Sequence, residues 1–205
     1  MKLVLMLQKV VNRFLMKAAV STIKNTNNAV YLTFDDGPEP EITEFVLDEL
    51  DKFGMKATFF CVGENAEKNP NLMDMITDRG HAIGNHTHTH RHAYSINSKE
   101  YIKDVEEANG VLQTHIFRPP NGCLLFSSWL ALRKKYKIIY WSIGSGDWCK
   151  ENFNYEDSME RLRKTQAGDI LLFHFSEDLQ MGTKRLLPDY LKWLHEQGLT
   201  SSVIS

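Results

Sequence analysis

Strand-like and helix-like segments alternate along most of this 205-residue sequence, and that alternation restricts its possible folds more than any other feature. Apolar, β-branched and aromatic runs predict seven strands, at 29–34, 57–62, 82–84, 116–118, 138–143, 170–173 and 200–204. Helical spacing lies between them, at 42–53, 65–78, 98–112, 127–135, 155–164 and 184–197. Strands separated by helices pair in parallel, so the sequence predicts an α/β fold, either a doubly wound open sheet or a barrel of βα repeats.

Turn residues support this division of the chain. Gly54, Gly80, Gly168 and Gly198 each follow a helical stretch and precede a strand, where a left-handed residue commonly ends a helix. There is no internal repeat and no Pro/Gly-rich linker, so we expect a single domain.

The first 28 residues are predicted to be an N-terminal docking segment. Its apolar residues recur with a helical period, at Leu3, Met6, Val10, Phe14 and Ala18. Four basic residues interrupt the apolar run, so it predicts neither a clear signal peptide nor a stable membrane span. Such a segment usually covers a core, and a membrane-surface anchor is the alternative.

Composition excludes several classes of protein. Hydrophobic residues make up 42% of the sequence and charged residues 24%, which is typical of a globular domain. There are 24 Lys and Arg residues against 26 Asp and Glu, so no global field attracts polyanions and we expect no nucleic-acid partner. The three cysteines are scattered and form no C-x-x-C spacing, so they predict neither a disulfide framework nor a thiolate metal site.

Histidines gather directly after the third predicted strand. His86, His88 and His90 lie there, and the carboxyl ends of parallel strands are where an α/β fold places its chemistry. A helical turn would put His86 and His90 on one face and bind a single metal ion, whereas an extended segment would align all three for a binuclear site. We favour the single ion. A binuclear site needs further histidines at later strand ends, and only His174 lies there.

A carboxylate can complete such a site. Asp35 and Asp36 follow the first predicted strand in the run Asp-Asp-Gly-Pro, which alone would indicate a solvated turn. Two histidines and one carboxylate leave coordination positions open for water and substrate, as in catalytic metal sites. One aspartate of the pair is then available as a base.

Three later strand ends also carry reactive or aromatic side chains. Arg118 lies in a rigid Arg-Pro-Pro turn, Asp147 and Trp148 follow the fifth predicted strand, and His174 follows the sixth. Each alone would be an ordinary turn or packing residue, but their shared position indicates one site.

Together these motifs resemble those of the polysaccharide deacetylases, the NodB-homology domain of carbohydrate esterase family four. The resemblance extends from about Val30 to the C-terminus, in the family's motif order: Thr-Phe-Asp-Asp-Gly at 33–37, His-Thr-x-x-His at 86–90, Arg-x-Pro at 118–120, Asp-Trp at 147–148 and Leu-x-His at 172–174. It implies a distorted (β/α)7 barrel with parallel strands, formed by residues 29–205.

The resemblance also implies a role for each matching residue. Asp35 is expected to be the general base and His174 the general acid, while Arg118 holds Asp35 in its carboxylate form. One divalent metal ion, commonly zinc in the family, is expected on Asp36, His86 and His90, with Thr87 bracing the histidine loop. The backbone N–H of Asn121 would stabilise an oxyanion, and Leu172 and Trp148 would line the acetyl pocket.

The sequence departs from the family's pattern at three positions. Gly144 replaces the first aspartate of the fourth motif, Asn121 replaces a frequent tyrosine, and Phe175 replaces a frequent aspartate. Asp147 is the carboxylate that we expect to take over the tuning of His174, and the alternative is that it has no role.

The activity implied is removal of N-acetyl groups from an N-acetylglucosamine-containing polysaccharide, of peptidoglycan or chitin type. The expected partner is therefore an acetylated glycan, and the family usually acts on envelope or extracellular glycans. The alternatives are an O-acetyl esterase of xylan type that uses the same site, and a sugar-binding protein that has lost its chemistry.

Overall fold

In a computed structural model, residues 19–24, 27–148, 153–175 and 180–205 are described. Residues 1–18 and 25–26 of the predicted docking segment lie outside the described residues. The described part of that segment contacts the sheet through two isolated bridges, from Val20 to Ile139, directly after residue 138, and from Thr22 to Asp169, directly before residue 170.

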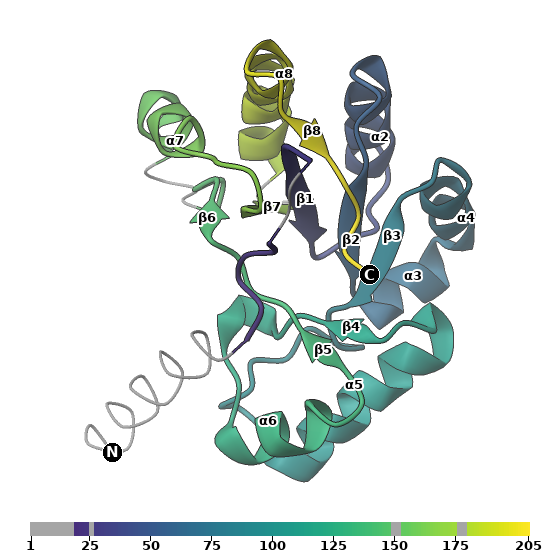
Figure 1. Ribbon diagram of the computed structural model, residues 1–205. Helices are drawn as coiled ribbons and strands as arrows, with labels where there is room; N and C mark the ends of the chain where they lie inside the picture. Colours follow the sequence, from purple (N-terminus) through teal and green to yellow (C-terminus); the bar gives the residue numbers. More distant parts are fainter. Residues whose placement is uncertain (1–18, 25–26, 149–152, 176–179) are drawn as a thin grey trace.

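The strands form one curled sheet in which all neighbours pair in parallel, which confirms the distorted (β/α)7 barrel (Figure 1). The strands are β1 (Ala29–Asp35), β2 (Ala57–Cys61), β3 (Ala82–Asn85), β4 (Ile116–Phe117), β5 (Lys137–Ile138), β6 (Ile143–Gly144), β7 (Ile170–His174) and β8 (Thr200–Ser201). Their order in space is β5-β4-β3-β2-β1-β7-β6, and β8 pairs with the start of β1.

Helices surround the strands (Figure 1). They are α2 (Ile42–Lys52), α3 (Gly63–Lys68), α4 (Pro70–Asp78), α5 (Ser98–Leu112), α6 (Phe126–Leu132), α7 (Tyr155–Leu162) and α8 (Gln180–Glu196), with a 3-10 turn at Pro120–Gly122. The helix predicted at 65–78 is two helices, because Pro70 lacks the N–H that would continue the first and instead occupies the first turn of the second. The four glycines expected to end helices all have positive φ.

The strand predicted at 138–143 is wrong, because its two ends belong to opposite edges of the sheet. Ile138 pairs with β4, whereas Ile143 pairs with β7. Between them the chain crosses from one edge of the sheet to the other. On the way, Val20 N–H donates to the Ile138 carbonyl, and Tyr140 N–H donates to the Val20 carbonyl. A β-branched run indicates extended backbone but not which strand each residue pairs with, so the sequence did not reveal the crossing.

Alternation along the central strands separates a helix-facing side from a barrel interior. Leu32 and Phe34 of β1 belong to the large core under α2 and α8, and Thr33 and Asp35 face the interior, where both bond to Arg118. A smaller interior cluster lies below the site and consists of Phe60, Ile116, Ile139, Ile170 and Ile204. The interior is therefore apolar at the bottom and polar at the carboxyl ends of the strands.

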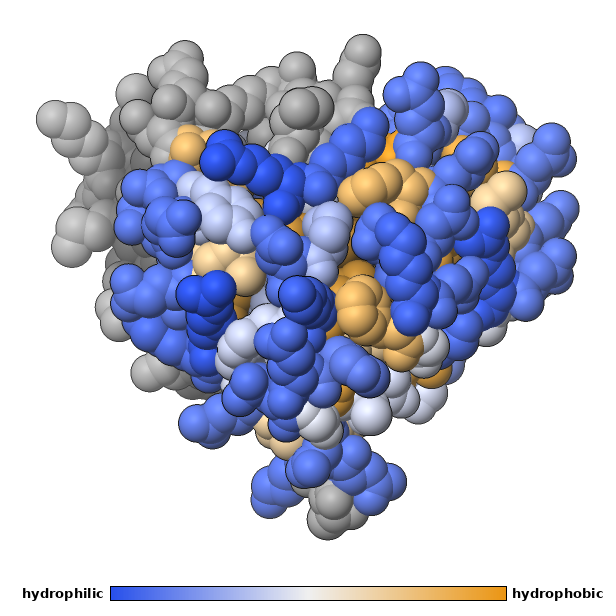
Figure 2. All heavy atoms as spheres, turned by 90° about the horizontal axis from the view of Figure 1, so that it is seen from above, coloured by the Kyte–Doolittle hydropathy of each residue, from blue (hydrophilic) through white to orange (hydrophobic). Residues whose placement is uncertain are grey.

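The outer surface of the helices is largely hydrophilic. Figure 2 shows this from the side of α2, α7 and α8, where hydrophobic side chains form only small patches among hydrophilic ones. None of the described helices combines the length and the apolar character needed to cross a bilayer.

Candidate active site

Asp35 and Asp36 lie at the end of β1, in the middle of the sheet. Asp35 is the last residue of the strand, and Asp36 has a φ of 75°, in the left-handed region where non-glycine residues are uncommon. Asn65 Nδ2 donates a hydrogen bond of 2.8 Å to the Asp36 carbonyl. This turn sends the two consecutive side chains to different partners instead of opposite faces of a strand.

The histidine loop after β3 is neither of the two conformations considered from the sequence. Residues 86–92 form no helical turn and no strand, and both Thr87 and His90 have positive φ. Thr87 N–H donates to Asn85 Oδ1 at 2.8 Å, and Thr87 Oγ1 accepts from His90 N–H at 3.0 Å. The hydrogen bonds hold a strained loop that brings His86 and His90 together, with ring centroids 5.1 Å apart.

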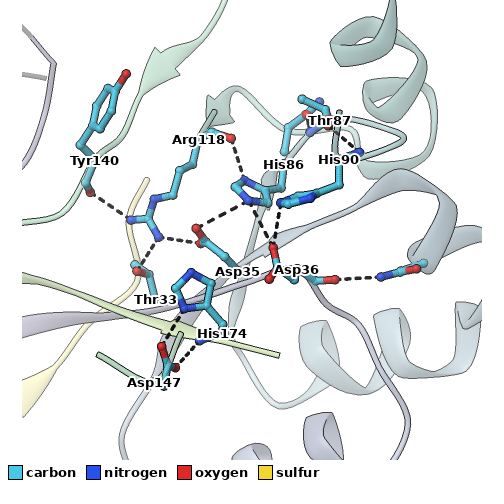
Figure 3. A network of polar contacts seen from close by, with 12 residues as sticks. Thr33, Asp35, Asp36, His86, Thr87, His90, Arg118, Tyr140, Asp147 and His174 are labelled. Atoms are coloured by element: carbon cyan, nitrogen blue, oxygen red, sulfur yellow. Dashed lines mark hydrogen bonds and ion pairs between the residues drawn. The ribbon is translucent and has the colours of Figure 1, made fainter. Parts of the chain in front are cut away.

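Three side chains converge on a point that could hold a metal ion (Figure 3). In the described part of the chain, Asp36, His86 and His90 form the group whose ligand atoms all lie within 4.8 Å of one another. Asp36 Oδ1 is 3.0 Å from His90 Nε2 and 3.5 Å from His86 Nε2. His88, by contrast, lies against Gly63 at the start of α3, away from this group.

The protonation of His86 fits a metal ligand. His86 Nδ1 lies 2.7 Å from the Arg118 carbonyl oxygen, which can only accept, so Nδ1 carries the proton. Nε2, which lies 3.5 Å from Asp36 Oδ1, is then the nitrogen that a metal ion could use, in the arrangement that metal-binding histidines usually adopt. The donor set of two imidazoles and one carboxylate fits zinc and related divalent ions.

The charges in this group favour an ionised aspartate. Burial would raise the pKa of Asp36, but hydrogen bonds to His86 and His90 and the charge of His174 lower it well below its ordinary value. Burial lowers the pKa of His90, and the opposing contact with Asp36 leaves that pKa raised. Asp36 is thus a carboxylate over the whole range in which a metal would compete with protons for the histidines.

Arg118 lies inside the barrel and pairs with Asp35. The arginine side chain is fully buried, and its Nη1 lies 2.7 Å from both Asp35 Oδ1 and Thr33 Oγ1. The other carboxylate oxygen, Asp35 Oδ2, lies 3.7 Å from His86 Nε2. Asp35 therefore bridges the arginine and the group of Asp36, His86 and His90 without belonging to that group itself.

Sequence reasoning did not identify the other partners of Arg118. Nη2 donates to the Tyr140 carbonyl at 3.0 Å, and the guanidinium carbon lies 4.1 Å from the centroid of the Phe60 ring. Burial lowers the pKa of Arg118, and Asp35 opposes that change. These contacts come from the crossing segment 139–142 and from β2, and neither carries a local pattern that would predict them.

His174 lies between Asp147 and the paired aspartates (Figure 3). Its Nδ1 is 2.8 Å from Asp147 Oδ1, and its backbone N–H donates to Asp147 Oδ2 at 2.7 Å. Burial favours the neutral imidazole, but the hydrogen bond with Asp147 and the charges of Asp147, Asp35 and Asp36 raise the pKa of His174 to about 9. Asp147, the carboxylate that the sequence indicated for the tuning of His174, lies behind the imidazole as its hydrogen-bonded partner.

Gly144, which stands where the fourth motif usually has an aspartate, makes room for Trp148. A Cβ atom at Gly144 would lie 2.4 Å from Cη2 of the Trp148 ring. The same ring meets His174 edge-on, with centroids 5.6 Å apart, and 41% of Trp148 is exposed. A carboxylate at position 144 would therefore displace the tryptophan.

Phe175, the second departure, belongs to the core. Its ring lies 5.1 Å from that of Phe34, and a Cβ atom at Gly37 would meet it at 2.6 Å. An aspartate in this apolar contact would be buried without a partner.

Asn121 and Leu172 are the two residues expected at the oxyanion and at the acetyl pocket. Asn121 has a φ of 57°, which an asparagine tolerates better than a tyrosine, and its N–H donates to no acceptor in the described part of the chain. Leu172 is buried on the interior face of β7, two residues before His174.

A sequence profile described as "Polysaccharide deacetylase" matches residues 22–137. Two proteins of Bacillus cereus, both called peptidoglycan-N-acetylglucosamine deacetylase, are similar. One is 40% identical over 127 residues, 58% of this chain, and the other is 30% identical over 192 residues, 89% of this chain. The chain spans 46% of the first relative's length and 89% of the second.

The fold is also similar to a solved structure. The Bc1960 peptidoglycan N-acetylglucosamine deacetylase, crystallised with a hydroxamate-type benzamide ligand, superposes with a TM-score of 0.81 at 32% identity. The match covers 91% of this chain and 90% of the solved one.

Proposed function

The chain belongs to the polysaccharide deacetylase family, and from that premise we propose that it hydrolyses N-acetyl groups on N-acetylglucosamine-containing polysaccharide of peptidoglycan or chitin type. The observation that carries the proposal is the placement of Asp35 and His174 beside a potential metal site made by Asp36, His86 and His90. The names of the relatives favour peptidoglycan among the possible polymers.

Asp36, His86 and His90 would hold one divalent ion. Bound there, the ion would polarise the acetyl carbonyl and make a water molecule more acidic. The protein's part is to hold these three side chains in place, through the His86–Arg118 carbonyl contact and the Thr87–His90 hydrogen bond.

The remaining residues would handle protons and charge. Asp35, held by Arg118 on one oxygen, has the other oxygen free to accept the proton of the attacking water. The unused N–H of Asn121 would donate to the oxyanion of the tetrahedral intermediate. His174, protonated by virtue of Asp147, would deliver a proton to the departing amine.

Trp148 and Leu172 would bound the space for the acetyl methyl group. Trp148 packs against His174 and stays partly exposed, as expected for an aromatic side chain that contacts a sugar. Leu172 is buried on β7, two residues before His174.

The test is release of acetate from N-acetylglucosamine oligomers and from intact peptidoglycan, measured with and without added zinc. We expect acetate release to require a metal. The His90→Ala substitution should abolish both metal binding and acetate release. His90 is the better variant, because 37% of its side chain is exposed, whereas His86 is buried and its loss would leave the Arg118 carbonyl without its donor.

Asp157→Asn, at an exposed position of α7, is the matched control and should behave as the wild type. Acetate released only from acetylated xylan would establish the O-acetyl esterase instead. Binding of oligomers without any release, in protein loaded with metal, would indicate a protein that has lost its chemistry.

A further inference from the structure

The carboxylate of Asp147 is held by α8 as well as by His174. Thr183 Oγ1, in the first turns of that helix, lies 2.8 Å from Asp147 Oδ2 and 3.0 Å from the His174 carbonyl oxygen. A hydroxyl has one proton to donate, and a carboxylate is the stronger acceptor, so the proton belongs on the bond to Asp147. Thr183 is fully buried, which makes that bond inaccessible to water.

The residue before it allows α8 to come this close. A Cβ atom at Gly182 would lie 3.0 Å from both Cα and Cβ of Asp147, tighter than side chains normally pack. The helix backbone thus rests directly on the loop that carries Asp147. Gly182 provides the space, and Thr183 provides the hydrogen bond.

The two oxygens of Asp147 have different partners as a result. Oδ1 faces the imidazole Nδ1 of His174, and Oδ2 accepts from the His174 backbone N–H and from Thr183. Without the threonine hydroxyl, Oδ2 would keep one donor and the carboxylate could rotate about its Cβ–Cγ bond, because terminal sp² torsions are broad. Rotation moves Oδ1 away from the imidazole.

We propose that Thr183 is a positioning residue for the deacetylation reaction, which fixes Asp147 so that His174 is presented as the proton donor. The inference rests on the function proposed above. Thr183 itself touches no reacting atom. It acts through Asp147, and the family motifs in the sequence contain no signal for it, since 36 residues separate the two positions.

The test compares Thr183→Val, which removes the hydroxyl and keeps the shape, with Thr183→Ser, which keeps the hydroxyl. We expect the valine variant to lose about tenfold in kcat with KM nearly unchanged, the low end of the loss when an orienting partner is removed. Serine should restore most of the rate. Thr183→Ala, with no methyl groups against the carboxylate, replaces valine if that variant does not fold.

Thr165→Val is the matched control. Thr165 is another buried threonine, whose hydroxyl bonds to the Leu162 carbonyl and to Tyr190 Oη, away from the site. It should lower thermal stability by an amount similar to Thr183→Val and leave kcat unchanged. Equal losses of kcat in the two variants, or an unchanged kcat in Thr183→Val, would overturn the proposal.

A second measurement is independent of turnover. The charged groups around His174 are Asp147, Asp35, Asp36 and His90. None of these is altered in Thr183→Val. NMR titration of the His174 ring in protein without metal should therefore give a lower pKa in this variant than in wild type and in Thr165→Val, and equal values would contradict the positioning role. If wild type released no acetate, the proposed function would fail while the titration still decided this inference.

Discussion

Two adjacent aspartates in this chain have different surroundings, and their side chains should not be interchangeable. Asp35 bonds to a buried arginine, whereas Asp36 lies between two histidines. The left-handed backbone of Asp36 produces this separation. The difference is a property of individual residues and can be tested with single substitutions.

We predict that Asp35→Asn keeps metal affinity and loses at least about a hundredfold in kcat, the low end of a general base's contribution. Asp36→Asn should weaken metal binding first, because an amide is a poorer ligand than a carboxylate, and excess metal should recover part of the rate. Titration with zinc, followed by acetate release, separates the two. Rescue of Asp35→Asn by metal would mean that base and ligand have been exchanged.

The pair of Asp147 and His174 gives a prediction about pH. A proton donor must be protonated, so activity should fall as pH rises through the pKa of His174, which Asp147 helps to raise to about 9. Asp147→Asn removes the negative charge, so the alkaline limb of the kcat profile should move to lower pH and the maximum should fall. An alkaline limb that stays in place would exclude tuning of His174 by this carboxylate.

At the scale of elements, the histidine loop depends on the helix behind it. Asp104 of α5 is buried, and its carboxylate accepts from Thr89 Oγ1 at 2.8 Å, while its carbonyl accepts from His88 N–H. Asn85, at the end of β3, bonds to both Thr87 N–H and the Val105 carbonyl. The strand and the helix thus fix the loop from two sides.

We predict that Asp104→Ala lowers metal affinity about tenfold, as expected when the residues that orient a ligand are lost. The loop carrying His90 would lose a buried acceptor, although no metal ligand changes. Metal affinity measured by competition with a chelator gives the result, and Lys103→Ala, an exposed neighbour on the same helix, is the control. Equal affinity in both variants would show that the loop holds its shape without α5.

At the scale of the whole molecule, the charge on His174 links folding to pH. Its pKa in the folded protein, about 9, is above the ordinary value of 6.5, so the folded state binds this proton more tightly than the unfolded state. The stabilising contribution is therefore complete below about pH 6.5 and is lost as pH rises towards about 9.

We predict that, with a chelator present, the free energy of unfolding of the wild type exceeds that of His174→Gln by less near about pH 9.5 than near about pH 6. Urea unfolding at the two pH values measures this difference directly. A difference that does not change with pH would mean that His174 has no raised pKa in the folded protein.

The alternation of strands and helices, the single domain and the clustering of reactive residues at strand ends all follow from the sequence, because hydrophobic periodicity and turn residues act locally. The motifs also predict a common location for Asp35, Asp36, His86, His90, Arg118 and His174, since each lies at or just after the end of a strand and the carboxyl ends of parallel strands meet. The helix predicted at 98–112 has the same bounds in the structure. Asn97 caps its start, and Gln113 takes the left-handed conformation at its end.

Tertiary structure alone decides where segment 138–143 divides, how the histidine loop turns, and which carboxylate reaches His174. These features depend on contacts between residues far apart in the chain, such as Val20 with Ile139 and Thr183 with Asp147. A local pattern reports the preference of a segment for extended or helical backbone, but the partner of a buried polar group is fixed only when the barrel closes and removes water as its alternative.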